Sequence, residues 1–498
     1  MNTLSEILSN DFYKLENILL GSKNYFAHRK DTPLQRELLS EHTDLTLKYF
    51  QKLVSANGLD KIVDLQITEF VKAEGFDDET IFSFIKESFV NTVYFHDFGK
   101  INENFQIHKM LNGSFQEKRN GIQTKHSILS SLLFLSYQIH QIYQSNFDDR
   151  VKISLYYLNI LFVQSISQHH SRLNNPDVFQ FDVVKQKILT EYVFKFKPFA
   201  KVDIELFWRV MGNNYNKILS ISKSIKNSFL PFSLVKLNSS LLTASDYYAT
   251  NEFMSGIKVN DFGTLSKKLN EKIIKNVKMI SYNNDLYNKY DFYNSISIDK
   301  LKEKNNKNLN LLRQCLSTNV IDELRKSIEN NLFYIEAPTG SGKTNLSLLF
   351  LSELLKKRKN VLKIFYVFPF TTLITQTFDS IKTNLQLYEK EIVEIHSKAS
   401  FNKTNDDANY GSDKLNYIDS LFINFPISLI SHVTFFDILT STNKEKTYLL
   451  HRLANSIVII DEIQSYAPSE WDKINYLIKQ FSVFYNITFL IMSATLPQ

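Results

Sequence analysis

The chain has 498 residues, of which 43% are hydrophobic, and a formal net charge of +6. This length predicts about three domains with packed cores. The single cysteine, Cys315, excludes a disulfide framework and a cysteine-ligated zinc site, and it favours a reducing, cytoplasmic compartment. The most apolar stretch, 153–166, is too short and too rich in tyrosine and serine to span a bilayer, so we expect no membrane association. The mild positive charge permits nucleic-acid binding but does not argue for it.

Residues 1–255 are predicted to form a mostly helical domain. Apolar residues recur there with the helical period, as in 37–47, and glycines are few. A helical bundle can hold a metal site where suitable side chains lie near helix ends or on inward faces. Histidines and aspartates occupy such places before, within and after the apolar runs of this region. The candidate metal ligands are His42, His96, Asp97, His126, His169, His170 and Asp246.

The adjacent pair His96-Asp97, within VYFHDFGK (93–100), stands at the centre of this set. Imidazole and carboxylate side chains of this kind can hold two transition-metal ions side by side. Asp97 can bridge both ions, because a carboxylate has two oxygens. Such imidazole-rich ligands suit Mn, Fe, Co, Ni or Zn better than Mg, which prefers oxygen. Two neighbouring metals suit in-line attack on a phosphodiester, so this region predicts a two-metal phosphodiesterase.

Residues 256–306 differ in composition and predict a linker with room for one helix. Asparagine, lysine and tyrosine crowd together there, as in 282–285 and 302–307. From about 307 strands and helices alternate, which predicts an α/β domain with a parallel sheet over 307–498. The expected strands are 332–336, 362–368, 456–460 and 488–492.

The sequence APTGSGKT (337–344) lies between the first expected strand and an expected helix over 346–355. It is typical of a phosphate-binding loop, whose backbone N–H groups and helix N-terminus bind phosphates. Lys343 is expected to reach the β- and γ-phosphates, and the Thr344 hydroxyl to bind Mg²⁺. Asp461 and Glu462 follow a buried apolar strand, where Asp461 can hold Mg²⁺ and Glu462 can orient and deprotonate the attacking water. We therefore expect ATP and Mg²⁺ as cofactors. The other expected nucleotide contacts are Thr339, Gly340, Ser341 and Gly342.

These motifs resemble the ordered motifs of superfamily 2 helicases. The phosphate loop is followed by Asp461-Glu462-Ile463-Gln464 and by Ser493-Ala494-Thr495, and Gln314 is a candidate adenine reader. A His/Asp domain followed by such a motor resembles the CRISPR-associated helicase–nuclease of type I systems, which the Cascade complex recruits to degrade foreign DNA. The resemblance implies an all-α HD nuclease domain over 1–255, a linker over 256–306 and a first RecA-like domain over 307–498.

The same resemblance implies a role for each ligand. One metal would be held by His42, His96, Asp97 and Asp246, and the other by Asp97, His126, His169 and His170. Lys100 would contact the scissile phosphate, and Ala27-His28 matches a family pattern near the site. The implied activity is metal-dependent cleavage of single-stranded DNA in antiviral defence, coupled to ATP-driven 3′–5′ translocation.

The family continues beyond its third helicase motif with a second RecA-like domain and a C-terminal domain, whereas this sequence stops at Gln498. We therefore expect helicase activity to be incomplete unless a separate second RecA-like domain is a partner.

Simpler interpretations remain open at this point. Lys100 can be a solvated helix residue, and Gln314 at a helix start needs no ligand. The helical domain can belong to a nucleotide phosphohydrolase of the same metal-binding superfamily, although the attached helicase motifs argue against it. The chain can also be a non-catalytic fragment.

Overall fold

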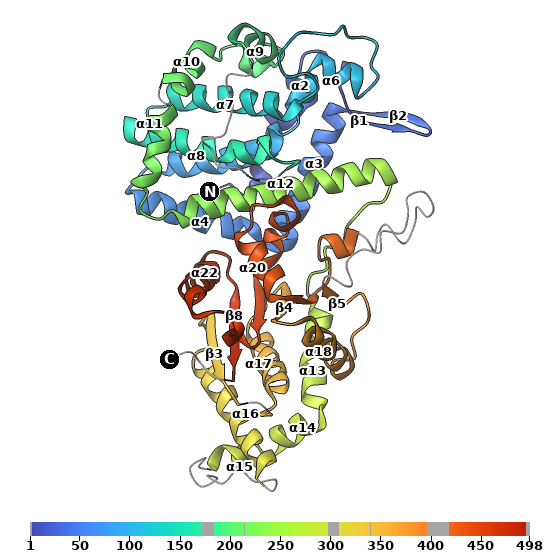
Figure 1. Ribbon diagram of the computed structural model, residues 1–498, viewed down its shortest axis with the longest axis vertical. Coiled ribbons are helices and arrows are strands. Elements are labelled where there is room, and N and C mark those ends of the chain that lie inside the picture. Colours follow the sequence, from blue (N-terminus) through green and yellow to red (C-terminus); the bar gives the residue numbers. More distant parts are fainter. Residues whose placement is uncertain are drawn as a thin grey trace. The chain divides into compact units, whose positions relative to one another are not determined.

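The structure is a computed structural model that describes residues 2–171, 173, 184–213, 215–296, 308–338, 340–395 and 418–494. It divides into two compact units (Figure 1). The first contains Met1–Asn260 and Thr440–His451, and the second contains Asp261–Leu439 and Arg452–Gln498. Across the described ranges, no helix combines the length and hydrophobicity that crossing a membrane requires.

The first unit is a helical bundle with one β-hairpin, so the predicted all-α class is confirmed and the hairpin was not foreseen. The hairpin pairs β1 (Phe26–Asp31) with β2 (Leu34–Leu38), antiparallel. The helices are α1 (Leu4–Ile7), α2 (Leu15–Ile18), α3 (Leu39–Asn57), α4 (Leu59–Glu74), α5 (Glu79–Phe95), α6 (Glu103–His108), α7 (His126–Gln144), α8 (Asp149–Ser167), α9 (Gln186–Val193), α10 (Ile204–Trp208), α11 (Tyr215–Ser220), α12 (Phe229–Ser255) and α21 (Lys444–Thr447). In Figure 1, α7 and α8 lie side by side and the long α12 runs past them.

The C-terminal half of α5 lies inside this bundle. Every residue from Ser88 to Phe95 is buried, which is typical of a helix covered on all sides. The helix ends at His96, and the 3-10 helix η3 (Phe98–Ile101) follows Asp97. The Phe95 ring is stacked on Phe199 with an interplanar angle of 5°, and Phe98 is stacked on Phe196 at 8°. Aromatic packing therefore fixes the short turn that carries His96 and Asp97 in the interior.

Gly99 allows η3 to approach the start of α7 closely. Its N–H donates to Ser130 Oγ at 2.8 Å, and a Cβ added at Gly99 would lie 2.0 Å from the His126 carbonyl oxygen. We expect Gly99→Ala to push the first turn of α7 away from Asp97 and to lower the free energy of unfolding by about 1–3 kcal/mol. Thermal unfolding of the metal-free protein measures this effect. Gly113→Ala is the matched control, since a Cβ there meets nothing within 4 Å, and equal melting temperatures for the two variants would contradict the prediction.

The second unit has the predicted parallel α/β fold. Its six-stranded sheet has the order β3-β8-β7-β4-β6-β5, and every pair is parallel. The strands are β3 (Leu332–Glu336), β4 (Lys363–Phe368), β5 (Ile392–Ile395), β6 (Ile427–Ser431), β7 (Ser456–Ile460) and β8 (Thr488–Ser493). The helices are α13 (Lys267–Met279), α14 (Ser281–Asn288), α15 (Tyr290–Ser295), α16 (Leu309–Lys326), α17 (Lys343–Lys357), α18 (Thr371–Asn384), α20 (His432–Thr440) and α22 (Trp471–Phe484).

The central strands explain why this part of the fold could be predicted. All residues of β4, β7 and β8 are buried, as expected for strands covered by helices on both faces. The strands expected at 332–336, 362–368, 456–460 and 488–492 match β3, β4, β7 and β8. β5 and β6 were not expected.

The segment 256–306 differs from the linker that its composition predicted. Its described part contains α13, α14 and α15, and the boundary between the two units falls after Asn260. Leu269, Ile273 and Val277 of α13 belong to the core of the second unit. Four positions separate each of these residues from the next, so they form one apolar stripe on an otherwise polar helix. The many lysines and asparagines around this stripe made the segment resemble a linker. Residues 297–306 lie outside the described residues.

Candidate metal centre and nucleotide site

Five parts of the helical unit bring the predicted metal ligands together. His42 lies in the first turn of α3, and His96 and Asp97 lie between α5 and η3. His126 opens α7, and Asp246 projects from α12. The remaining two, His169 and His170, follow the end of α8. Apart from His170, which is exposed, the set is buried or half-buried.

The Asp97 carboxylate lies between two groups of ligands. Its Oδ2 atom is 3.2 Å from His42 Nε2 and 3.4 Å from His96 Nε2. Its Oδ1 atom is 3.2 Å from His126 Nε2 and 3.8 Å from His169 Nε2. Asp246 Oδ1 completes the first side, 3.2 Å from His42 Nε2. Each carboxylate oxygen of Asp97 therefore faces a different set of imidazoles.

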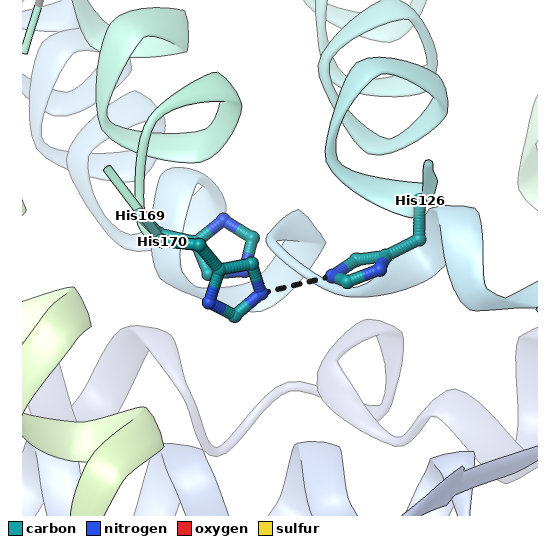
Figure 2. A group of neighbouring side chains, drawn as sticks. All are labelled: His126, His169 and His170. Carbon is teal, nitrogen blue, oxygen red and sulfur yellow. Dashed lines mark hydrogen bonds between the residues drawn. The ribbon is translucent and has the colours of Figure 1, made fainter. Parts of the chain in front are cut away.

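The second set consists of His126, His169 and His170 (Figure 2). The His126 and His170 rings point toward each other from opposite sides, and their Nε2 atoms lie 3.1 Å apart. Burial lowers the pKa of His126, and burial with the neighbouring His170 charge holds the pKa of His169 well below its usual value. Desolvation of its ring lowers the pKa of His170 to about 4, although the residue as a whole is exposed. At neutral pH these three imidazoles are neutral, which is the form that coordinates a metal.

Two backbone hydrogen bonds aim imidazoles at the centre. His96 Nδ1–H donates to the Val93 carbonyl at 2.8 Å, and His169 Nδ1–H donates to the Ile166 carbonyl at 2.6 Å. Because a carbonyl only accepts, each Nδ1 carries a proton, and Nε2 is the nitrogen that each ring turns toward the centre. Among the described residues, neither Nε2 atom has a hydrogen-bond partner, although both are buried. Such backbone-anchored rings are typical of metal-ligating histidines.

The two carboxylates remain ionised inside the protein. Burial alone would raise the pKa of Asp97, but the charges of Lys100 and His96 hold it well below its usual value. Burial acts in the same direction on the pKa of Asp246, and hydrogen bonds from His42 and His96 outweigh it. Both Asp97 oxygens are buried without a well-aligned hydrogen bond in the described structure. Buried carboxylate oxygens without well-aligned hydrogen bonds are costly unless cations lie beside them. Lys100 Nζ lies 2.7 Å from Oδ2, and the imidazole nitrogens around both oxygens fit a pair of metal ions.

Lys100 is not the solvated residue that a simpler interpretation allowed. Its side chain is 4% exposed, and Nζ lies 2.7 Å from Asp97 Oδ2 and 3.2 Å from His28 Nε2. His28 was noted from the sequence, whereas its neighbour Glu37 was missed. His28 Nδ1 donates to Glu37 Oε2 at 2.8 Å, so the hairpin contributes to the surroundings of the centre. No spacing pattern marks Glu37, because its position depends on strand pairing.

The nucleotide motifs meet at the carboxyl ends of the parallel strands in the second unit. Gly340 and Gly342 have φ values of 78° and 87°, which bend the phosphate loop into α17. The Lys343 ammonium pairs with Glu462, which lies after β7. Gln464 also donates to Glu462, and it accepts from Ser493 Oγ at 2.7 Å. Thr339 and Thr495 lie outside the described residues.

Asp461 is held beside this pair by backbone contacts. Its N–H donates to the Val367 carbonyl at 3.0 Å, and its Oδ1 accepts from Glu462 N at 2.9 Å. Burial raises the pKa of Asp461 to about 6 and outweighs the attraction of Lys343. The phosphate-loop lysine and the two acidic residues after β7 therefore lie in one charged cluster, which consists of Lys343, Asp461 and Glu462.

A cavity of about 340 Å³ adjoins the phosphate loop. Its lining includes Tyr282, Arg313, Ser341, Gly342 and Thr344. Arg313 reaches over the loop and donates twice to the Gly340 carbonyl, at 2.9 and 2.6 Å. The expected adenine reader, Gln314, is buried behind this lining and donates to the Tyr282 carbonyl at 3.0 Å.

Comparison with known proteins agrees with this arrangement. The family model described as DEAD/DEAH box helicase matches residues 313–498. The crystal structure of T. fusca Cas3 with ADP is 14% identical, with a TM-score of 0.55, and the match covers 96% of this chain and 51% of that one. The structure of T. fusca Cas3 with ATP is 15% identical, with a TM-score of 0.51, and the match covers 96% and 50%. No curated protein sequence matches the chain.

At this identity the likeness shows the fold, and the chain spans about half the length of the Cas3 structures that it matches. The match extends over both units, so the predicted order of a helical domain before a helicase domain is confirmed. Residues 313–498 match the DEAD/DEAH box helicase model, and the chain has the fold of the matching half of the T. fusca Cas3 structures.

Proposed function

We propose that the first unit is a metal-dependent nuclease that cleaves single-stranded DNA. The observation that carries this proposal is the Asp97 carboxylate, whose two oxygens face two separate sets of imidazoles. Two divalent transition-metal ions, when bound, would supply an activated water and neutralise the charge that develops on the phosphate. Mn, Fe, Co and Ni suit the imidazole-rich ligands better than Mg. His42, His96, Asp97 and Asp246 would hold one ion, and Asp97, His126, His169 and His170 the other.

Lys100 has a separate role in this proposal. Its ammonium group lies at the Asp97 carboxylate, within the charged centre, and is nearly excluded from solvent. A buried cation at this place can donate hydrogen bonds to a phosphate oxygen and hold the scissile phosphate in line.

We propose that the second unit binds ATP with Mg²⁺ and acts as the motor of the same system. Lys343 would release Glu462 and contact the phosphates, while Thr344 and Asp461 would hold Mg²⁺. Glu462 would then orient the attacking water. Translocation along DNA in the 3′–5′ direction, recruitment by a Cascade-type complex and a role in antiviral defence follow from the family resemblance and form part of the proposal. A separately supplied second RecA-like domain is a proposed partner for ATP turnover.

A substrate panel tests the nuclease against the alternative of a nucleotide phosphohydrolase. Metal-free protein is supplied with Mn²⁺, Co²⁺ or Ni²⁺ and incubated with a single-stranded oligonucleotide, its duplex, and nucleoside mono- and triphosphates. We expect the single strand to be cleaved at least about tenfold faster than the duplex, because an intact duplex must first unpair to expose a strand. Release of phosphate from nucleotides without cleavage of DNA would favour the alternative.

A further inference from the structure

The β-hairpin places a buried carboxylate behind the metal centre. In the pairing of β1 with β2, His28 stands directly opposite Glu37, and the register shifts just before His28. Directly opposed residues on paired strands have side chains on the same face. A local shift in register commonly re-aims a side chain next to a functional site. The hairpin therefore turns His28 and Glu37 toward α3, which begins two residues after Glu37.

Glu37 Oε2 lies between two imidazoles. It is 2.8 Å from His28 Nδ1 and 3.3 Å from His42 Nδ1. The opposite nitrogen of His42, Nε2, faces Asp97 and Asp246 at 3.2 Å each. His42 therefore stands between the outer carboxylate of Glu37 and the two carboxylates of the proposed metal centre. In the described structure, His42 Nδ1 makes no well-aligned hydrogen bond, and Glu37 Oε2 is a carboxylate oxygen within ion-pair distance of it.

We propose that Glu37 is a positioning residue for the first metal, acting through His42. An ionised carboxylate at Nδ1 keeps the proton on that nitrogen, orients the ring and leaves the Nε2 lone pair for the metal. Carboxylates behind ligating histidines commonly act in this way. The inference rests on the proposed function, since it assumes that His42 is a ligand.

The Glu37 carboxylate is also connected to the metal centre through a second chain of contacts, by way of His28 and Lys100. Because His28 Nδ1 donates to Glu37, its Nε2 is the accepting nitrogen, and Lys100 Nζ lies 3.2 Å away. Lys100 in turn lies 2.7 Å from Asp97 Oδ2. Glu37 thus contacts both the proposed ligand His42 and His28, the residue that lies against Lys100. Its side chain is 4% exposed, so it is buried together with these partners.

Two other roles for Glu37 must be separated from this one. Glu37, His28 and His42 have ligand atoms close enough to hold a metal of their own. That arrangement would require His42 to coordinate through both nitrogens at once, with Lys100 beside His28. The second alternative is that Glu37 only stabilises the start of α3, since acidic side chains favour helix N-termini.

The test is metal binding by the folded, metal-free chain. Co²⁺ is titrated in competition with a chromophoric chelator, and bound cobalt is counted by mass spectrometry. Wild-type protein should bind two ions. Asp246→Ala and His170→Ala identify which binding step belongs to which ligand set. We expect Glu37→Gln to weaken the step affected by Asp246→Ala by about 10–100-fold and to leave the other step within about twofold. Glu37→Asp, which keeps the charge, should fall between Glu37→Gln and wild type.

The matched control is Glu74→Gln, which changes another buried carboxylate of the same unit that belongs to none of the candidate metal groups. Wild-type affinity for both ions in Glu37→Gln would overturn the inference. The inference would also be overturned if wild-type protein bound three ions and Glu37→Gln bound two, because Glu37 would then be a metal ligand itself. If Glu37→Gln does not fold, Glu37→Asp decides, and wild-type affinity in that variant contradicts the proposal. Wild-type protein that binds no cobalt would instead defeat the proposed function.

Discussion

Asp97→Asn should reduce metal-dependent cleavage of single-stranded DNA by about 10³-fold or more. The substitution keeps the size of the side chain but replaces one carboxylate oxygen with an NH₂ group, which cannot coordinate a metal. Because the two oxygens face different imidazole sets, one of the two sets loses its shared ligand whichever way the amide turns. Metal-assisted charge stabilisation amounts to several kcal/mol in the transition state, and about 4 kcal/mol corresponds to about 10³ in rate.

The measurement is the initial rate of oligonucleotide cleavage with Mn²⁺ or Co²⁺ in excess. Asp44→Asn is the control, because Asp44 lies on α3 but belongs to none of the candidate metal groups. Circular dichroism should show that both variants are folded. Equal rates for Asp97→Asn and the control would remove Asp97 from the mechanism.

Lys343→Ala should weaken nucleotide binding by about 10–150-fold. The loss of one hydrogen bond to a charged group costs about 1.5–3 kcal/mol, which corresponds to this range of dissociation constants. The Lys343 ammonium pairs with Glu462 in the structure, so the phosphates of ATP must compete with the Glu462 carboxylate for this ammonium group. The variant also frees Glu462, which then repels the phosphates and adds to the loss.

Fluorescence titration with a labelled ATP analogue and Mg²⁺ measures this effect without requiring turnover. Lys356→Ala, at the other end of α17, is the matched control because its ammonium pairs with Glu353 of the same helix. An unchanged dissociation constant for Lys343→Ala would show that the loop does not bind phosphate through this side chain. Nuclease activity should be unchanged in both variants, since all proposed metal ligands precede residue 247.

The residues of the candidate centre were predictable because their chemistry is visible in their type. A histidine–aspartate pair is common by chance, and the further histidines and Asp246 that can join it made the pair informative. Asp97 is buried, as a bridging ligand inside a helical bundle would be. Lys343 and Asp461 were predictable for a similar reason, because each follows an apolar strand in a recognisable motif. By contrast, Glu37 became visible only through its pairing with His28. A glutamate in a charged segment has many ordinary explanations, and the pairing of strands cannot be read from their composition.

Three of the parts of the fold that escaped prediction share a physical cause. β5 has four residues and is only partly buried, so its apolar pattern is too short to distinguish from a loop. The hairpin strands β1 and β2 are largely polar, and most of their residues are half-buried. The helices of 267–295 bury narrow stripes within lysine- and asparagine-rich sequence. In each case tertiary packing, and not local propensity, decides the structure.

The most direct test of the central claim is cleavage of single-stranded DNA before and after removal of metal. Purified protein is stripped with a chelator, dialysed, and assayed alone and after addition of Mn²⁺, Co²⁺, Ni²⁺ or Mg²⁺, with bound metal counted in parallel. We expect no cleavage by the stripped protein, recovery when two transition-metal ions bind, and poor recovery with Mg²⁺. Full cleavage by protein that retains no metal, or no cleavage by protein with two ions bound, would contradict this claim.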